Sequence, residues 1–143
     1  MRILRAVLDT NVFVSSLLVK KGLPAQVLDA WRERRYLLII SPAIISEIRA
    51  TLNYPRIRRK YAVTDEDVEQ LVALLERDAL VVPGDADVAG SVRDPADEMV
   101  LACAVEAQAD VIVSGDRHLL DLDTYQDIPI LTTRQFLERV EEG

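Results

Sequence analysis

The stretch from Arg93 to Asp116, RDPADEMVLACAVEAQADVIVSGD, constrains the fold more than any other part of the chain. It begins with Asp94-Pro95, which is typical of a helix start, because Asp caps the first turn and Pro lacks only an N–H that has no partner there. Residues 99–105 are all apolar, which predicts a helix buried on most sides. Residues 111–113 predict a short buried parallel strand. A helix that leads into such a strand is the repeating unit of an α/β sheet.

Short apolar runs recur along the rest of the chain and alternate with helical patterns. We predict five strands, at residues 3–8, 37–40, 79–82, 111–113 and 129–131, with the last at an edge of the sheet. Helix starts are indicated at Ser41-Pro42, at Thr64, and at Thr132 with Gln135, whereas residues 117–127 look irregular. We expect an α/β fold, a three-layer α/β/α sandwich with a five-stranded, mainly parallel sheet of order 3-2-1-4-5, as a single domain over residues 1–143.

Length and composition are those of one globular domain. Half of the 143 residues are hydrophobic and 29% are charged. There is no run of 18 apolar residues, so we predict no membrane span and no membrane partner. The single cysteine, Cys103, excludes an internal disulfide and a Cys-rich zinc site. The N-terminal apolar run is too short for a signal peptide, so we expect a cytoplasmic protein.

Charge is distributed unevenly along the chain. The net charge of −7 disfavours a nucleic-acid partner, but residues 1–60 hold twelve Lys/Arg and four Asp/Glu, whereas residues 61–143 hold five and twenty. Such a chain can carry a basic surface beside an acidic site, although the charges also fit solvated faces of unrelated helices. The candidates for contact with the phosphates of a nucleic acid are Arg49, Arg56, Arg58, Arg59 and Lys60.

Four acids fall near element ends on the same side of the predicted sheet. Asp9 follows the first strand and Asp116 follows the fourth, and these strands are neighbours in the predicted order. Glu47 lies on the helix after the second strand, and Asp97 lies in the first turn of the helix before the fourth. Clustered carboxylates repel one another, and Mg²⁺ or Mn²⁺, as one or two ions, would compensate them. Such ions activate water and stabilise a phosphodiester transition state.

Each of these residues also has an ordinary structural explanation. Asp94 caps a helix, Asp97 complements a helix dipole, and Glu47 fits a solvated helix face. Thr10 and Asn11 could cap the first helix, and Ser114 could be a turn residue. The coincidence of four acids at one edge of the sheet favours the functional interpretation. His118, a lone histidine in a loop, is more often a surface residue, so it stays outside the predicted site.

The sequence resembles the PIN-domain nucleases over essentially its whole length. The resemblance rests on Asp9-Thr10-Asn11 after the first strand, Glu47, Asp97 and Ser114-Gly115-Asp116 after the fourth strand. The run RDPADEMVLACAVEAQADVIVSGDRHLL is similar to the VapC-like subgroup, the toxin components of toxin–antitoxin systems. The resemblance implies a Mg²⁺- or Mn²⁺-dependent ribonuclease acting on single-stranded or structured RNA. It also implies a cognate antitoxin that blocks the site, and a homodimer or higher homo-oligomer.

The resemblance also assigns expected roles to individual residues. Asp9, Glu47, Asp97 and Asp116 match the acidic quartet of the family, which implies catalytic and metal-binding roles. Thr10, Asn11 and Ser114 match polar supporting positions, and Ser114 keeps the hydroxyl where many relatives have Thr. Asp94 is an additional acid in the pattern of this subgroup.

Other functional classes that use acids at strand ends fit less well. A receiver domain needs a lysine after a late strand, but Thr132-Thr133-Arg134 follows the fifth strand here. An aspartyl phosphatase needs a second Asp two residues after the first, and Asn11 stands at that position. A nucleotide-binding fold is disfavoured because no Gly-rich loop follows any strand. A catalytically silent binding module with the same fold remains the main alternative.

Overall fold

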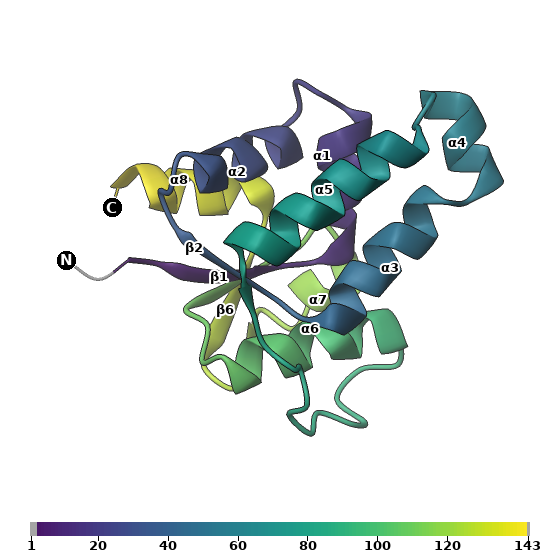
Figure 1. The fold of residues 1–143 in the computed structure, drawn as a ribbon. Helices are drawn as coiled ribbons and strands as arrows, with labels where there is room; N and C mark the ends of the chain where they lie inside the picture. The colour runs from purple at the N-terminus through teal and green to yellow at the C-terminus, as the bar shows by residue number, and fades with distance from the viewer. Residues whose placement is uncertain (1–2, 143) are drawn as a thin grey trace.

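Within residues 3–142 the sheet has six strands, in the order β3-β2-β1-β4-β6-β5 (Figure 1). The computed structural model describes residues 3–142. The strands are β1 (Arg5–Leu8), β2 (Leu37–Ile40), β3 (Leu80–Val81), β4 (Val111–Val113), β5 (Thr124–Tyr125) and β6 (Ile128–Leu131). Every neighbouring pair is parallel except β5 and β6. The five predicted strands correspond to β1, β2, β3, β4 and β6, and their predicted order is confirmed.

The prediction was wrong about the number of strands and about which strand forms the edge. The segment expected to be irregular forms a short helix, α7 (Arg117–Leu120), and the strand β5. β5 pairs antiparallel with β6, so β6 is an interior strand. The connecting residues Gln126 and Asp127 both have positive φ, at 47° and 67°, as in a type I′ hairpin turn. Such turns usually carry Asn-Gly, so this sequence gave no hairpin signal.

Helices cover both faces of the sheet, which confirms the three-layer sandwich. α1 (Thr10–Leu18), α2 (Leu23–Arg32), α5 (Asp65–Asp78) and α8 (Thr133–Glu142) lie above the sheet in Figure 1, and α6 (Pro95–Glu106) lies below it. α3 (Pro42–Leu52) contacts both α1 and α6. Within residues 3–142, no helix has both the length and the apolar composition needed to cross a bilayer.

The helix starts follow the predicted capping signals. The Thr64 hydroxyl accepts the N–H of Asp67 at 3.1 Å, while the Asp67 carboxylate accepts the N–H of Thr64 at 3.0 Å. Thr132 and Gln135 form the same reciprocal pair at the start of α8. Because each cap satisfies N–H groups that have no partner within the helix, these residues fix where the helices begin.

The central strands are buried, as their continuous apolar sequences predicted. Ala6, Val7 and Leu8 of β1 and all of β4 are inaccessible to solvent. Above the sheet, the Tyr36 ring meets Phe136 of α8 edge to face, with ring centroids 4.8 Å apart. Burial of one such side chain stabilises the fold by about 1.5–3 kcal/mol. The sheet is therefore a rigid base for the residues that follow its strands.

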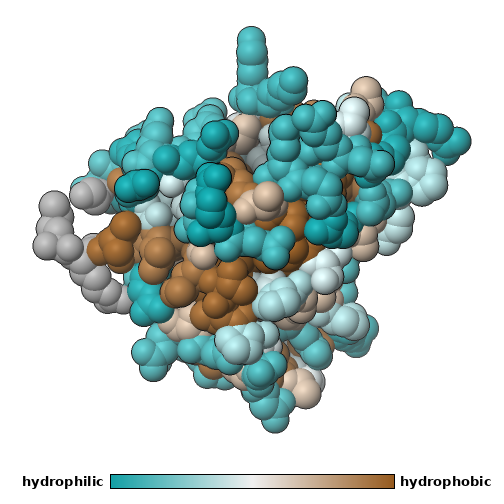
Figure 2. All heavy atoms as spheres, viewed as in Figure 1, coloured by the Kyte–Doolittle hydropathy of each residue, from teal (hydrophilic) through white to brown (hydrophobic). Residues whose placement is uncertain are grey.

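Two surface features stand out from this body. α4 (Pro55–Tyr61) projects away from the rest of the chain and has no buried residue (Figure 1). Its surroundings are hydrophilic in Figure 2, whereas apolar side chains gather in the middle of the same view. The edge strand β3 contributes to the exposed apolar surface, because Leu80 and Val81 are about 40% exposed. The molecule thus presents a polar arm and a separate apolar edge.

Candidate active site

The register of two parallel strands brings the ends of β1 and β4 together. Leu8 lies beside Val113, so the next residues, Asp9 and Ser114, leave the sheet at the same level. The N–H of Asp9 donates to the carbonyl of Val113 at 2.8 Å, and the N–H of Ser114 donates to the carbonyl of Leu131 at 3.0 Å. Since these bonds continue the strand ladder, the backbone fixes both residues at the carboxyl edge of the sheet, where α/β sites form.

The Ser114 hydroxyl links two of the predicted acids. It donates to Oδ2 of Asp9 at 2.8 Å and accepts the N–H of Asp116 at 2.9 Å. Ser114 is inaccessible to solvent, so neither bond competes with water. The hydroxyl therefore orients the Asp9 carboxylate and fixes the turn that carries Asp116.

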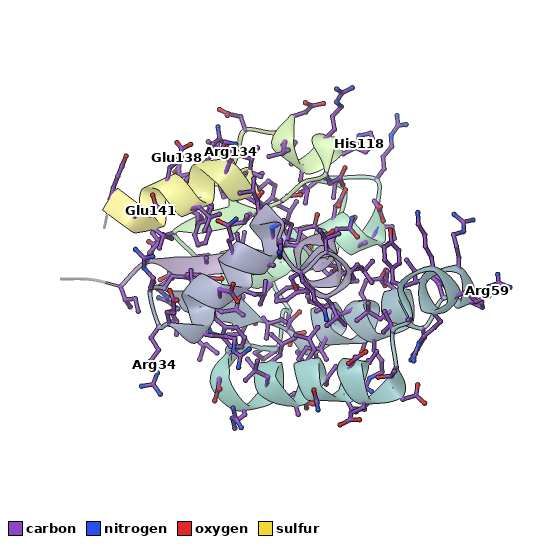
Figure 3. The ribbon with its side chains drawn as sticks, turned by 90° about the horizontal axis from the view of Figure 1, so that it is seen from above. Arg34, Arg59, His118, Arg134, Glu138 and Glu141 are labelled. Carbon is purple, nitrogen blue, oxygen red and sulfur yellow. The ribbon has the colours of Figure 1, made fainter. Side chains whose placement is uncertain are left out.

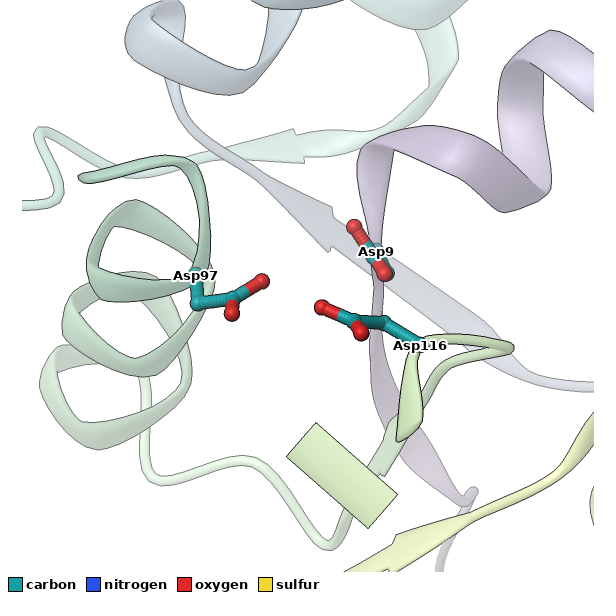
Figure 4. A group of neighbouring side chains, drawn as sticks. All are labelled: Asp9, Asp97 and Asp116. Carbon is teal, nitrogen blue, oxygen red and sulfur yellow. The ribbon is translucent and has the colours of Figure 1, made fainter. Parts of the chain in front are cut away.

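A third acid reaches the same place from α6. Asp94 caps this helix by accepting the N–H of Ala96 at 2.9 Å, which places Asp97 in the first turn. Asp9, Asp97 and Asp116 each offer a carboxylate oxygen, and these oxygens lie within 4.8 Å of one another (Figure 4). Asp9 and Asp97 are only 4% exposed, and Asp116 is half-buried. We call these three residues the acidic triad.

Burial and mutual repulsion make the triad costly in its charged form. Burial is the main cause that raises the pKa of Asp97 to about 7, followed by its hydrogen bond to Asp116 and by the charges of Asp116, Asp94 and Asp9. Burial also raises the pKa of Asp9, although the Ser114 hydroxyl opposes this shift. Without a compensating cation, Asp97 therefore keeps its proton to a much higher pH than an exposed aspartate.

The donor set of the triad fits a hard divalent cation. It consists of carboxylate oxygens, the ligands that Mg²⁺ and Mn²⁺ prefer. Within residues 3–142, no lysine or arginine forms an ion pair with these acids. The neighbouring Thr10 is buried and its hydroxyl has no hydrogen-bond partner in the described part of the chain, so it remains available to a bound water or ligand. Buried charge, close donors and a free hydroxyl together match a cation site.

Three other predicted site residues, Glu47, Asp94 and Asn11, are not part of the triad. Glu47 is half-buried on α3, and it stands outside the group of acids that the described residues bring together. Asp94 and Asn11 are exposed. The catalytic and metal-binding roles of Glu47 therefore remain predictions, as do the supporting roles of Asp94 and Asn11.

The predicted RNA-binding cations differ in how far they are already engaged. Arg49 pairs with Glu69 of α5. Arg58 donates to the carbonyls of Leu52 and Val63 at 3.1 and 3.2 Å, and pairs with Asp65 at 2.8 Å. Arg56, Arg59 and Lys60 are exposed and form no ion pair within residues 3–142 (Figure 3 labels Arg59). These last three, on α4, are the most available for a nucleic acid.

A pocket of about 410 Å³ adjoins the triad, and it contains residues that were not predicted. Its lining residues are Val92, Arg93, Asp94, Asp97 and His118. His118 follows Asp116 by two residues, and its N–H donates to Oδ1 of Asp116 at 3.0 Å. This closeness to a predicted acid was the signal that could have drawn attention to His118. Arg93, beside the Asp94 cap, had the same signal.

Comparison with other proteins places the chain in a family. The family model described as "PIN domain" matches residues 5–118. The uncharacterized protein MJ1680 of Methanocaldococcus jannaschii is 26% identical over 147 residues, which cover 97% of this chain and 93% of that protein.

Two solved structures share the fold. One is VapBC2 from Rickettsia felis bound to a DNA fragment from its promoter, with a TM-score of 0.61 and 10% identity over 90% of this chain and 98% of that one. The other is DNA-bound VapBC from Salmonella typhimurium, with a TM-score of 0.60 and 19% identity. The match covers 92% of this chain and 99% of that one. At these identities the likeness concerns the fold. Together with the family match over most of its length, it shows that this chain belongs to the PIN-domain family.

Proposed function

We propose that this protein is a Mg²⁺- or Mn²⁺-dependent endoribonuclease that hydrolyses RNA phosphodiester bonds. The observation that carries the proposal is the acidic triad, three carboxylates gathered in a largely buried position without a cationic partner among residues 3–142. Because such a cluster lowers the stability of the metal-free protein, its presence favours a functional role. Membership of the PIN-domain family supports the same class of reaction.

The residues of the chain have distinct parts in this proposal. When bound, one or two divalent ions would lower the pKa of a coordinated water and stabilise charge on the phosphate. Asp9, Asp97 and Asp116 would hold these ions, with Glu47 as an additional acid. Ser114 keeps the Asp9 carboxylate in one orientation through its 2.8 Å hydrogen bond. Backbone hydrogen bonds at the carboxyl edge of the sheet limit the movement of Asp9 and Ser114.

We propose α4, the polar arm described above, as the surface that binds the RNA backbone. Arg56, Arg59 and Lys60 are exposed, and the cationic run is the densest in the chain. Cations that neutralise phosphates supply most of the sequence-independent affinity for nucleic acids. Arg49 and Arg58 would first have to give up contacts within the protein. We therefore assign the main RNA contact to Arg56, Arg59 and Lys60, which form no ion pair within residues 3–142.

We further propose that the protein is the toxin of a toxin–antitoxin pair. The support is its structural likeness to the VapBC complexes and the VapC-like run around Asp97 and Asp116. A protein antitoxin would then bind the chain and block the triad. Induced expression in a bacterial host should arrest growth, whereas expression of Asp116→Asn should not. A cytoplasmic location and a homodimer or higher homo-oligomer stay predictions, and light scattering measures the latter.

Cleavage of a labelled single-stranded RNA by the purified protein tests the enzymatic proposal. We expect cutting in Mg²⁺ or Mn²⁺, none in EDTA, and none by Asp9→Asn or Asp116→Asn. Asp29→Asn is the matched control, because Asp29 is exposed on α2 and outside the triad. Cutting that survives both triad substitutions would contradict the assigned site. Failure to cut several RNAs with either metal would instead favour the catalytically silent binding module.

A further inference from the structure

The pocket beside the triad combines features of a site for part of a nucleotide. Its volume of about 410 Å³ lies within the range of roughly 300–1,000 Å³ found for small-ligand sites. Asp97 belongs both to its lining and to the acidic triad, so a group bound in this pocket would lie next to the proposed metal site. Its lining residues include one apolar side chain, Val92, and two that can donate to phosphate oxygens, Arg93 and His118.

Arg93 and His118 are both connected to residues 117–127, the segment that was expected to be irregular and that forms α7 and β5. His118 lies in α7, whose start is capped by the Asp116 carboxylate at 3.0 Å from the N–H of His118. The loop that carries Arg93 is tied to β5, because the Ser91 and Tyr125 hydroxyls lie 2.6 Å apart and share a hydrogen bond. The cap fixes the backbone of His118, the hydroxyl pair fixes the loop two residues before Arg93, and both residues are exposed.

Charge also indicates what this pocket can accept. Asp94 and Asp97 are the acids among its lining residues, and Arg93 is the lining residue with a permanent positive charge. Within residues 3–142, the side chains of Arg93 and His118 form neither an ion pair nor a hydrogen bond. A phosphate next to the triad needs donors that balance this negative lining, and a guanidinium is suited to bidentate phosphate contacts.

We propose that Arg93 and His118 form a phosphate-binding subsite for the nucleotide next to the cleaved bond. The inference rests on the proposed ribonuclease function and goes beyond it by assigning the substrate contacts on the α6 side of the triad. Arg93 and His118 would set how the strand lies across the triad, whereas the α4 arm would bind the backbone farther away. They are positioning residues, and they take no part in holding the ion.

Two measurements test this subsite. The first is cleavage of a short fluorescein-labelled single-stranded RNA of mixed sequence in Mg²⁺, which gives KM and kcat. The second is the anisotropy of the same RNA with Asp116→Asn, which blocks turnover, alone or combined with Arg93→Gln or His118→Asn. We expect Arg93→Gln to raise KM and Kd about tenfold and His118→Asn about threefold. For Arg93→Gln, the slope of log affinity against log salt should fall by about 0.7.

Arg34→Gln is the matched control, since Arg34 is exposed and lies on the opposite side of the molecule from His118 (Figure 3). It removes the same charge and should leave KM, Kd and the salt slope close to those of the parent protein. If the wild type cleaves RNA and Arg93→Gln behaves like Arg34→Gln, the subsite is refuted and the ribonuclease function stands. If the wild type neither cleaves nor binds the RNA, both proposals fail. Thermal melts of the variants check that a loss of affinity does not reflect unfolding.

Discussion

The acidic triad and the α4 arm are opposite in almost every physical respect. The triad gathers carboxylates in a largely buried place, where β1, β4 and α6 fix their positions. The arm spreads cations over a seven-residue helix that has no buried residue. Burial, together with the charges of neighbouring acids, therefore raises the pKa of Asp9 and of Asp97, whereas water screens the charges of the arm.

This difference indicates which charges lower the stability of the fold. Charges in the triad act on one another at short range and low exposure, so changing one alters the stability of the whole protein. Charges on the arm act mainly on a partner, so changing them should alter binding alone. Arg58 is an exception within the arm, because it bonds to the backbone at the ends of α3 and α4 and pairs with Asp65 of α5. Four measurements of stability test this difference between the triad and the arm, in order of decreasing expected effect.

Addition of Mn²⁺ should produce the largest change. Because the triad lacks a compensating charge, an ion that binds the folded state alone should stabilise it by about 2.7 kcal/mol at a hundred times its dissociation constant. Thermal melts with Mn²⁺ and with EDTA measure this difference. Asp116→Asn should remove most of it and Asp29→Asn should keep it. An equal shift in all three proteins would mean that the ion binds elsewhere.

Asp97→Asn should stabilise the metal-free protein at pH 8. Folding raises the pKa of Asp97 from 3.8 to about 7, so its favourable contribution is complete below pH 3.8 and is lost as the pH rises to about 7. The substitution should add on the order of 1–2 kcal/mol at pH 8 in EDTA and little at pH 4. Asp67 and Asp78, whose pKa values are lowered, lose their contributions only in more acidic solution and do not affect this window.

Urea unfolding at several pH values, in EDTA, measures the effect of Asp97→Asn. With Mn²⁺ present the sign should reverse, because the variant loses a proposed ligand. If metal-free Asp97→Asn is no more stable than the wild type at pH 8, the charged form of Asp97 does not destabilise the fold.

Arg58→Gln should lower the free energy of unfolding by about 1 kcal/mol. The change removes the guanidinium that bonds to the carbonyls of Leu52 and Val63 and pairs with Asp65. Arg59→Gln on the same helix is the control and should change stability by less than about 0.5 kcal/mol, because Arg59 is exposed. Urea unfolding compares the two. If Arg58→Gln and Arg59→Gln are equally stable, Arg58 has no structural role.

Removing the three free cations of the arm should change stability least. The triple variant Arg56→Gln, Arg59→Gln and Lys60→Gln should have a free energy of unfolding within about 0.5 kcal/mol of that of the wild type. Its RNA affinity should fall, and the salt slope should decrease by about 2, at about 0.7 for each lost phosphate contact. The matched control replaces three other exposed arginines, Arg32, Arg34 and Arg35, of which Arg34 lies at the opposite end of the molecule from Arg59 (Figure 3). If both triple variants lose RNA affinity equally, net charge rather than the arm governs binding.

Local sequence signals predicted most of the elements. Apolar runs identified five of the six strands, and capping residues such as Thr64 and Asp94 gave the helix starts. Asp9, Glu47, Asp97 and Asp116 were predicted to converge, because parallel strands in the expected doubly wound order end at one edge, and the structure gathers all of these except Glu47. The hairpin of β5 and β6 was missed because its turn has Gln126 and Asp127 in place of the usual residues.

The sequence by itself therefore determined the α/β class, the positions of five strands, and the placing of Asp9, Asp97 and Asp116 next to strand or helix ends. These follow from hydrophobic periodicity, capping and strand ends, which are local properties. Only the tertiary structure decided that Arg58 is engaged within the protein and that Glu47 lies outside the triad. It alone also brought Arg93 and His118 into one pocket. The physical reason is that pKa shifts, ion pairs and pockets depend on distances between segments far apart in the chain.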